Sequence, residues 1–316
     1  MRVVVTGGTG LIGSALAQSL GQDGHEVVIL SRNPRQAGPM PETVTFQKWD
    51  GLSTGSWVQA LEGADAVVHL AGASIAGDDF LPARWTRERK KLIIDSRVKS
   101  GKALVEALQT VSKKPRIFVQ SSAVGYYGVH NDGKDITEES PAGNDFLADV
   151  CKQWEASTAD VEEMGLRRII IRTGVVLDKD EGALPRLVLP FKLFAGGPLG
   201  SGKQPFPWIH LDDEVGAIRF LMADGRASGP FNLSAPNPLT NAQFARVLGK
   251  VLGRPSFVPA PGFAFNMAFG EVATVVVDGQ KALPKRLLDM GYKFKFPTAE
   301  EALKDIFTPE KRLATV

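Results

Sequence analysis

Short apolar runs alternate with amphipathic segments along the first part of the chain. Each run is rich in Val, Ile or Leu, and the segments between several of them repeat apolar positions at helical spacing. Continuous apolar strands separated by helices indicate a parallel sheet that is covered on both faces. The predicted strands are Val3–Val5, Val27–Leu30, Val44–Lys48, Ala66–Leu70, Arg116–Gln120 and Arg168–Arg172, and the predicted helices follow Ile12 and cover Arg87–Leu108 and Asp149–Met164.

Beyond residue 175 the alternation weakens, and Gly and Pro interrupt the pattern more often. Leu184–Phe194 is apolar, Trp208–His210 is expected to be a short strand, and helices are expected over Asp212–Met222 and Asn241–Leu252. We therefore predict an α/β fold, a Rossmann-type doubly wound parallel sheet with a smaller C-terminal α/β substrate domain.

The expected domain division follows from this change of pattern. The sheet domain covers residues 1–175 and is completed by about residues 205–235. The smaller domain takes residues 176–204 and 236–316, so the chain is expected to cross between the two.

Composition and charge exclude several classes of function. The 316 residues carry 37 basic and 35 acidic side chains, a net charge of +2, which argues against a nucleic-acid surface. The basic run Arg84–Arg89–Lys90–Lys91 is expected to be a solvated helix face. One cysteine excludes an internal disulfide and a cysteine-based zinc site, and the four histidines lack metal-ligand spacing. We expect no metal, no membrane segment and no signal peptide, and a reducing, cytoplasmic location; the oligomeric state stays open.

The strongest local signal is Thr6-Gly7-Gly8-Thr9-Gly10-Leu11-Ile12-Gly13, which follows a strand and opens a helix. In a dinucleotide site the first glycine permits the tight turn, the second lets the backbone approach a diphosphate, and the third allows close helix–strand packing. The helix N-terminus then offers free N–H groups to the phosphates. Gly7, Thr9, Gly10, Leu11, Ile12 and Gly13 are the predicted phosphate-side residues; the alternative is a plain glycine-rich turn.

The end of the second strand suggests which dinucleotide binds. Sites for NAD usually place an acid there, whereas this chain has Ser31 and Arg32, a hydroxyl and a guanidinium suited to a 2′-phosphate. We therefore predict NADP(H); the alternative is that Arg32 points to solvent. Asp50 is expected either to bond the adenine or to form a loop turn.

Small residues after the fourth strand extend the predicted cofactor site. Leu70, Ala71 and Gly72 would let the cofactor lie close to the backbone, and Ser121 is expected on the same side. Arg97 either reaches the cofactor or is a solvated helix charge. His69 is expected to be a packed histidine.

The glycine spacing resembles that of the short-chain dehydrogenase/reductase superfamily, and Gly8-Thr9 with Leu11-Ile12 is most similar to its extended, epimerase-like branch. Further matches extend the resemblance over nearly the whole chain. It looks like an uncharacterised epimerase family group with a C-terminal domain of unknown function. The matching segments are Phe118–Gly128, Gly196–Gly202, Phe206–Asp213, Pro230–Leu233 and Gly279–Arg286.

The resemblance implies a catalytic Tyr, a Lys four residues later and a Ser or Thr that holds the substrate oxygen. This chain departs from that pattern, because Leu147, Cys151 and Ala123 stand at the three expected positions. Tyr127 and Ser122, on the loop after the fifth strand, are the replacement catalytic candidates. The alternative for Tyr127 is aromatic packing, and Cys151 is expected to be a buried helix thiol.

Substrate recognition is expected from the less regular part, from Arg186, Lys203, Gln204, Trp208 and the loop Gly196–Gly202, which is either a lid or an ordinary connection. His210 is expected at a strand-to-helix junction, with Asp212 or Asp213 as the N-cap. The predicted function is an NADP(H)-dependent oxidoreductase or epimerase-like enzyme acting on an unknown small polar substrate. The alternative is a non-catalytic NADP(H)-binding sensor or assembly factor.

Overall fold

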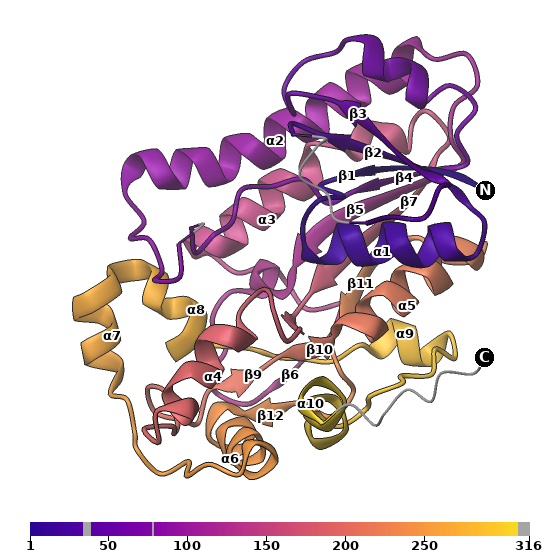
Figure 1. Cartoon of the computed structure of the whole chain (residues 1–316). Helices are drawn as coiled ribbons and strands as arrows, with labels where there is room; N and C mark the ends of the chain where they lie inside the picture. The colour runs from indigo at the N-terminus through magenta and orange to yellow at the C-terminus, as the bar shows by residue number, and fades with distance from the viewer. Residues whose placement is uncertain (34–38, 78, 309–316) are drawn as a thin grey trace, which may run out of the picture.

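A computed structural model describes residues 1–33, 39–77 and 79–308 of the chain. Its centre is a sheet of seven parallel strands in the order β3-β2-β1-β4-β5-β7-β11 (Figure 1). The chain order runs outward from β1 in one direction and then from β4 in the other, so the switch point lies between these two strands. The strands are β1 (Arg2–Thr6), β2 (Glu26–Ser31), β3 (Val44–Lys48), β4 (Ala66–His69), β5 (Ile117–Ala123), β7 (Arg167–Thr173) and β11 (Gly229–Leu233).

Helices cover both faces of this sheet, which confirms the doubly wound prediction. Val3 and Val5 point to one side, where α1 (Leu11–Gln22) and α5 (Leu211–Ala223) pack. Val4 points to the other side, toward α2 (Arg87–Thr110), and α3 (Phe146–Ala156) packs beside α2. Val3, Val4 and Val5 are all fully buried, so β1 is covered on both faces, which explains its unbroken apolar run.

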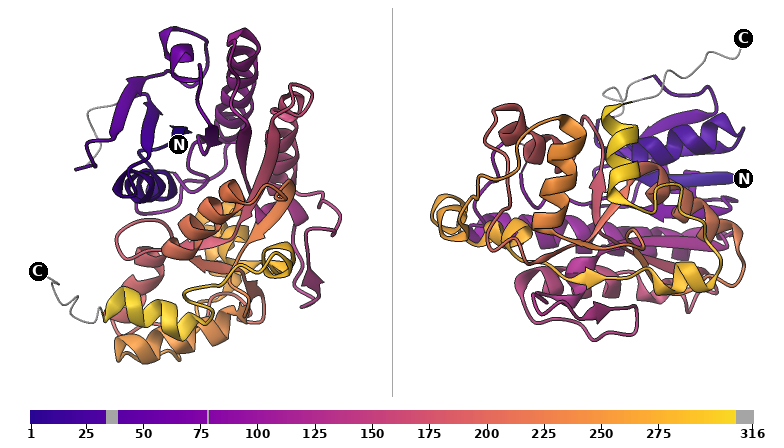
Figure 2. Two further views of the ribbon diagram at one scale, coloured as in Figure 1. Left: turned by 90° about the vertical axis from the view of Figure 1, so that its right-hand side faces the viewer. Right: turned by 90° about the horizontal axis from the view of Figure 1, so that it is seen from below.

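A second apolar core belongs to the smaller part of the molecule. The paired helices α6 and α10 lie side by side, away from the large sheet (Figure 2). The elements of this part are α4 (Leu184–Lys192), α6 (Asn241–Leu252), α10 (Ala299–Phe307) and the antiparallel pair β9 (Pro205–Phe206) and β12 (Leu239–Thr240). The smaller part is connected to the large sheet by β8 (Val175–Leu177), which follows β7 along the chain and pairs with β10 (Trp208–His210).

The segment with α7 (Gly262–Phe269) and α8 (Thr274–Val277) reaches back to the helices of the large sheet. Val272 packs against Trp85, Ile93 and Val150. Lys90 pairs with Glu271 at 2.5 Å, and Arg84 donates to the carbonyls of Met267 and Ala268. The basic run therefore lies at the surface, with Arg84 exposed and the Lys90 side chain 30% exposed, but these two side chains also bind the segment around α7.

After α8 the chain adds two further short elements beside the large sheet. They are β13 (Lys281–Ala282), which pairs with β6 (Asp135–Ile136), and the short helix α9 (Lys285–Asp289).

Most predicted elements are confirmed to within a few residues, and one helix boundary is corrected. The helix expected over Asp149–Met164 begins at Phe146, because the Asp145 carboxylate accepts the Ala148 N–H at 2.9 Å and caps it. It ends at Ala156, before a separate 3-10 turn over Ala159–Val161. Among the described residues, no helix is both long and apolar enough to cross a membrane.

Candidate active site

The glycine loop between β1 and α1 has the geometry that its sequence predicts. Gly7 has a φ of 69°, in the left-handed region, and an added Cβ would lie 2.8 Å from the Leu70 carbonyl carbon. At Gly13 an added Cβ would lie 2.4 Å from the Gly7 oxygen. These two glycines are therefore required by the packing of the protein itself.

Gly10 differs, because an added Cβ would meet only the Gly7 oxygen, at an ordinary 3.5 Å. It is exposed and forms the N-cap of α1, and no side chain caps this end of the helix in the described part of the chain. The first N–H groups of the helix are thus free to bind an anion. The open cradle of backbone amides fits a dinucleotide diphosphate.

The two residues predicted to select NADP(H) lie at the carboxyl end of β2. Arg32 is exposed and has no ion-pair partner among the described residues, while the Ser31 hydroxyl accepts the Asn33 N–H at 3.2 Å. Asp50 instead binds its own loop, accepting from Leu52 N–H at 2.8 Å and from the Ser53 hydroxyl at 2.5 Å. These hydrogen bonds lower the pKa of Asp50 and favour the loop-turn alternative over adenine binding.

The end of β4 brings further predicted residues to the same edge. His69 is fully buried, its Nδ1 lies 2.8 Å from the Thr6 hydroxyl, and burial lowers its pKa to about 3, so the packed-histidine prediction is confirmed. Ala71 N–H donates to the same Thr6 hydroxyl at 3.3 Å, which fixes the chain from Leu70 to Gly72 against β1.

Arg97, on α2, is held beside these residues. Its Nη1 donates to the carbonyls of Ala73 and Ile93 at 2.9 and 3.0 Å, and the guanidinium stacks on Trp154 at 4.8 Å. Burial, foremost, lowers its pKa to about 10. Arg97 is therefore not a solvated helix charge, and its contact with the cofactor stays a prediction.

A cavity of about 430 Å³ opens at the carboxyl ends of β5 and β7. It adjoins the glycine loop, because Ile12 of α1 lies in its wall. Ser121 and Ser122 of β5 line it, and so do residues from the C-terminal segment. Ligand sites of this fold lie at this edge of the sheet.

The positions of the missing catalytic pair are part of this wall. Leu147 and Cys151 on α3 both line the cavity, and so does Ala123. The Cys151 thiol lies 3.7 Å from the Ala123 carbonyl oxygen, to which it donates, and burial raises its pKa to about 11. A thiol with that pKa is a poor nucleophile, which agrees with the prediction of a buried helix cysteine.

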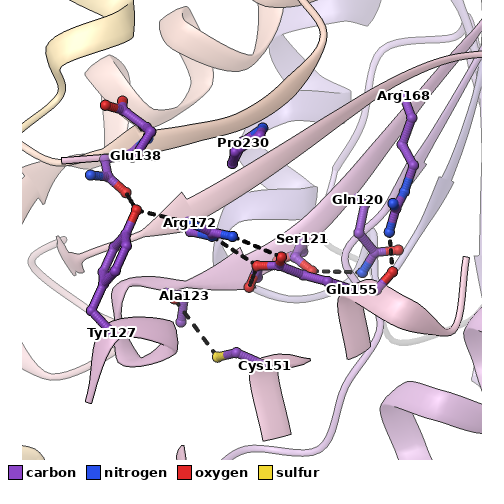
Figure 3. Close-up of polar contacts among 12 residues, drawn as sticks. Gln120, Ser121, Ala123, Tyr127, Glu138, Cys151, Glu155, Arg168, Arg172 and Pro230 are labelled. Carbon is purple, nitrogen blue, oxygen red and sulfur yellow. Dashed lines mark hydrogen bonds and ion pairs between the residues drawn. The ribbon is translucent and has the colours of Figure 1, made fainter. Parts of the chain in front are cut away.

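A chain of polar contacts links Glu155, Arg172 and Tyr127 (Figure 3). The Ser122 hydroxyl donates to Glu155 at 2.7 Å, and Arg172 binds both oxygens of that carboxylate at 2.9 Å. Arg172 also donates to the Tyr127 hydroxyl at 3.0 Å, and this hydroxyl donates to Asn232 at 2.7 Å. Ser122 is therefore a cavity residue whose orientation is fixed from behind.

Tyr127 is fully buried, with its hydroxyl occupied on both sides by Arg172 and Asn232. Burial raises its pKa to about 12. It is not among the residues that line the cavity, within the described part of the chain. This placement favours the packing alternative over a proton donor.

Sequence reasoning missed four residues at or near the site: Glu155, Arg172, Glu214 and Gln280. A charged residue at the end of an apolar strand was a usable signal for Arg172. Glu214 is fully buried, accepts the Thr173 hydroxyl at 2.7 Å, and has its pKa raised to about 8 by burial. The sequence did not indicate that Glu214 is buried, since it lies in a helix between other acids and apolar residues.

The residues predicted to bind substrate in the second part mostly have other roles. The Gln204 side-chain amide donates to the carbonyls of Leu199 and Val276 at 2.8 and 3.1 Å and so holds the Gly196–Gly202 loop in place. This favours an ordinary connection over a lid. Trp208 is buried in the core, Lys203 is exposed, and Arg186 donates to the Asp79 carbonyl.

The junction predicted at His210 is confirmed, but its cap is corrected. His210 itself caps α5, because its Nδ1 accepts the Asp212 N–H at 3.0 Å. Asp213 instead binds the C-terminal segment, accepting the N–H groups of Lys295 and Phe296 at 2.7 and 2.8 Å. Within the described ranges, no three His, Cys, Asp or Glu side chains gather as a metal site would require.

Comparisons with known proteins agree with this geometry. Residues 3–234 match the NAD dependent epimerase/dehydratase family, and residues 260–306 match a domain of unknown function, DUF1731. The epimerase family protein SDR39U1 homolog, chloroplastic, of Arabidopsis thaliana is 40% identical over 97% of this chain and 86% of its own length. The epimerase family protein YfhF of Bacillus subtilis is 37% identical over 98% of this chain and 99% of its own length.

A solved structure extends the similarity to the coordinates. The crystal structure of human epimerase family protein SDR39U1 (isoform 2) with NADPH superposes with a TM-score of 0.86, at 36% identity, and the match covers 98% of this chain and 100% of the human one. The chain therefore belongs to the NAD dependent epimerase/dehydratase family, as the glycine loop and the later motifs had indicated.

Proposed function

We propose that this protein is an NADP(H)-dependent oxidoreductase of the epimerase-like branch, which exchanges a hydride with a carbonyl compound held in the cavity. The observation that carries the proposal is that the two sites adjoin, since Ile12 of the glycine-loop helix lines the same cavity as Ser121 and Ser122. When bound, the cofactor supplies the hydride. The carbonyl carbon gains that hydride and its oxygen takes a proton from solvent, so the products are an alcohol and NADP⁺.

The choice of NADP(H) over NAD(H) rests on the end of β2. Arg32 is exposed and without an ion-pair partner in the described part of the chain, so its guanidinium is available for a 2′-phosphate. The human relative crystallised with NADPH supports the same choice. The free thiol of Cys151 suits the reducing, cytoplasmic location expected for such an enzyme.

Within the cavity, we assign Ser122 to hold the substrate oxygen, by turning its hydroxyl proton from Glu155 to that oxygen when the substrate binds. Ser122 lies on the wall, and Glu155, itself bound by Arg172, holds its hydroxyl in place before the substrate arrives. Tyr127 is the weaker of the two predicted catalytic residues, because its hydroxyl is already paired with Arg172 and Asn232.

The second candidate function is a non-catalytic NADP(H)-binding sensor or assembly factor. Leu147 on the cavity wall favours it, because this side chain has no proton to transfer where the family places a tyrosine. The size of the cavity favours the enzyme, since 430 Å³ lies in the range of small-molecule sites.

Two measurements test the proposal. Fluorescence titration with NADPH and NADH should show tighter binding of NADPH. The protein is then incubated with NADPH deuterated at nicotinamide C4 and a panel of carbonyl compounds, and mass spectrometry detects deuterium in the alcohols. We expect labelled alcohol from at least one compound, formed at least about tenfold more slowly by Ser122→Ala.

The matched control is Ser112→Ala, which changes an exposed serine far from the cavity and should leave the rate unchanged. Tighter binding of NADH would overturn the cofactor assignment. NADPH binding without label in any alcohol would favour the sensor.

A further inference from the structure

Gln280 is a buried cavity residue that the proposed function leaves without a role. It lies between α8 and β13, lines the cavity and is only 8% exposed. None of the described residues forms a hydrogen bond with its side-chain amide. The amide atoms themselves are not fully enclosed by the protein, so this unpaired group on the cavity wall is open to a ligand.

The backbone around Gln280 is held from several directions. The Gly279 carbonyl accepts the His130 N–H at 2.8 Å, and the Gly279 N–H donates to Asn131 at 3.1 Å. An added Cβ at Gly279 would lie 1.9 Å from the Pro205 oxygen, so the chain passes directly against that loop. Lys281 and Ala282 then pair with β6. The amide is therefore presented by a fixed backbone, which lowers the ordering cost of binding.

Apart from Trp154, whose buried indole N–H also lacks a partner among the described residues, the other polar side chains of the wall have partners or lie on the cofactor side. Ser121, also without a side-chain partner among the described residues, belongs to β5, where the cofactor is expected. The paired ones are Ser122 with Glu155, Thr173 with Glu214, Asp145 with the Ala148 N–H, and Thr274 with Asp278.

The charge of the wall limits the kind of substrate. Arg97 is the sole cation among the described lining residues, and it is bound to backbone carbonyls beside Gly72 and stacked on Trp154, also toward the cofactor side. A phosphorylated or carboxylated substrate would need further cations. Most of the remaining wall is apolar: Ile75, Val124, Leu147, Val150, Val175, Phe206 and Val275.

We infer that Gln280 is a substrate-binding residue, whose amide donates a hydrogen bond to the oxygen of an uncharged, predominantly apolar ketone or aldehyde. The inference rests on the proposed function for the reaction, but on Gln280 and the apolar wall for the substrate class. It replaces the small polar substrate expected from the sequence. Desolvation in the cavity strengthens this hydrogen bond, which together with that of Ser122 orients a substrate that is otherwise held by apolar packing.

The test uses two ligand pairs of matched shape, acetophenone with ethylbenzene and benzophenone with diphenylmethane. Saturation-transfer NMR gives the Kd of each ligand for the full chain, with and without NADP⁺, which allows no reduction. Gln280→Leu should raise the Kd of each ketone relative to its hydrocarbon by about fivefold, the value of one neutral hydrogen bond. Gln280→Met keeps the length of the side chain and should do the same.

The matched control is Gln109→Leu, which removes an exposed amide at the end of α2 and should leave the ratio unchanged. An unchanged ratio in both Gln280 variants, the absence of binding by either ketone, or displacement of a bound ketone by UDP-glucose would each overturn the inference. If the ratio changes as expected but no dinucleotide binds, the proposed function fails and the assignment of Gln280 stands.

Discussion

The glycine loop and the cavity adjoin each other, yet the chain builds them in opposite ways. The loop comes from one continuous stretch, residues 7–13, in which Gly7 and Gly13 are required by contacts within that stretch and with Leu70, directly after β4. The cavity takes its wall from residues as far apart as Ile12 and Gln280. A local site can therefore be read from spacing alone, whereas the role of a cavity residue depends on partners that only the fold brings together.

The largest effect is expected from Gly13→Ala, which tests how strictly the loop is built. An added methyl group would lie 2.4 Å from the Gly7 oxygen and 2.7 Å from the Gly8 Cα, and both are backbone atoms. We expect NADPH affinity to fall at least about a hundredfold and stability to fall by about 3 kcal/mol. Fluorescence titration and urea unfolding measure the two losses.

Gly10→Ala is the matched control, because its methyl group meets only the Gly7 oxygen at 3.5 Å. Its backbone, at a φ of −92°, accepts alanine. Stability should change by less than about 1 kcal/mol, while NADPH still binds about tenfold more weakly. Equal losses of stability in Gly13→Ala and Gly10→Ala would contradict the distinction between a glycine required by packing and a glycine that faces the ligand.

The protonation of Glu214, beside the cavity, should make the free energy of unfolding depend on pH, whereas the glycine loop has no side chain that titrates. Burial raises the pKa of Glu214 to about 8 from an ordinary 4.5, and Glu214 binds the cavity residue Thr173. The folded protein therefore holds a proton that the unfolded chain releases, so Glu214 costs no stability below about pH 4.5 and lowers it increasingly until about pH 8. Glu214→Gln should match the natural protein at pH 4.5 and exceed its stability at pH 9 by about 3 kcal/mol.

Urea unfolding at these two pH values gives the comparison. Glu106→Gln alters an exposed carboxyl and should show the same difference from the natural protein at both. A Glu214→Gln variant that is less stable at pH 9 would show that the buried carboxylate has a stabilising role at the cavity.

The same contrast explains what the sequence could and could not predict. The sheet, its helices, Gly7, Gly13 and the buried state of His69 follow from local patterns of apolar and small residues. The loss of the Tyr–Lys pair was also readable, because Leu147 and Cys151 stand four residues apart on one helix.

What could not be predicted depends on pairs that are distant in sequence. Asp50 was a candidate for adenine binding until its bonds to Ser53 were known. The hydroxyl of Tyr127 donates to Asn232, 105 positions away, and the spacing of residues in the sequence does not indicate that contact. Gln280 lay inside a recognised motif, but only the fold brings it to a cavity wall shared with Ile12.

Arg32→Ala sharpens the comparison at the outer end of the cofactor site. The side chain is exposed, so the fold should not depend on it. We expect NADPH affinity to fall about tenfold, the value of a charge-assisted contact, while NADH affinity stays unchanged. Parallel titrations with the two dinucleotides measure the effect, and an equal loss for both would show that Arg32 does not recognise the 2′-phosphate.

The smallest effect is expected from Tyr127→Phe, which asks whether this side chain belongs to the reaction or to the packing. Removing the hydroxyl leaves Asn232 without its donor and Arg172 without one acceptor, so stability should fall by about 1 kcal/mol. Deuteride transfer should keep its rate, because the hydroxyl points into the buried network and not into the cavity.

Tyr126→Phe is the matched control. Its ring also stacks on Arg172, but no described residue forms a hydrogen bond with its hydroxyl, so neither stability nor rate should change. A tenfold slower transfer in Tyr127→Phe with unchanged stability would show that this tyrosine takes part in the reaction, and that the buried network and not solvent delivers the proton.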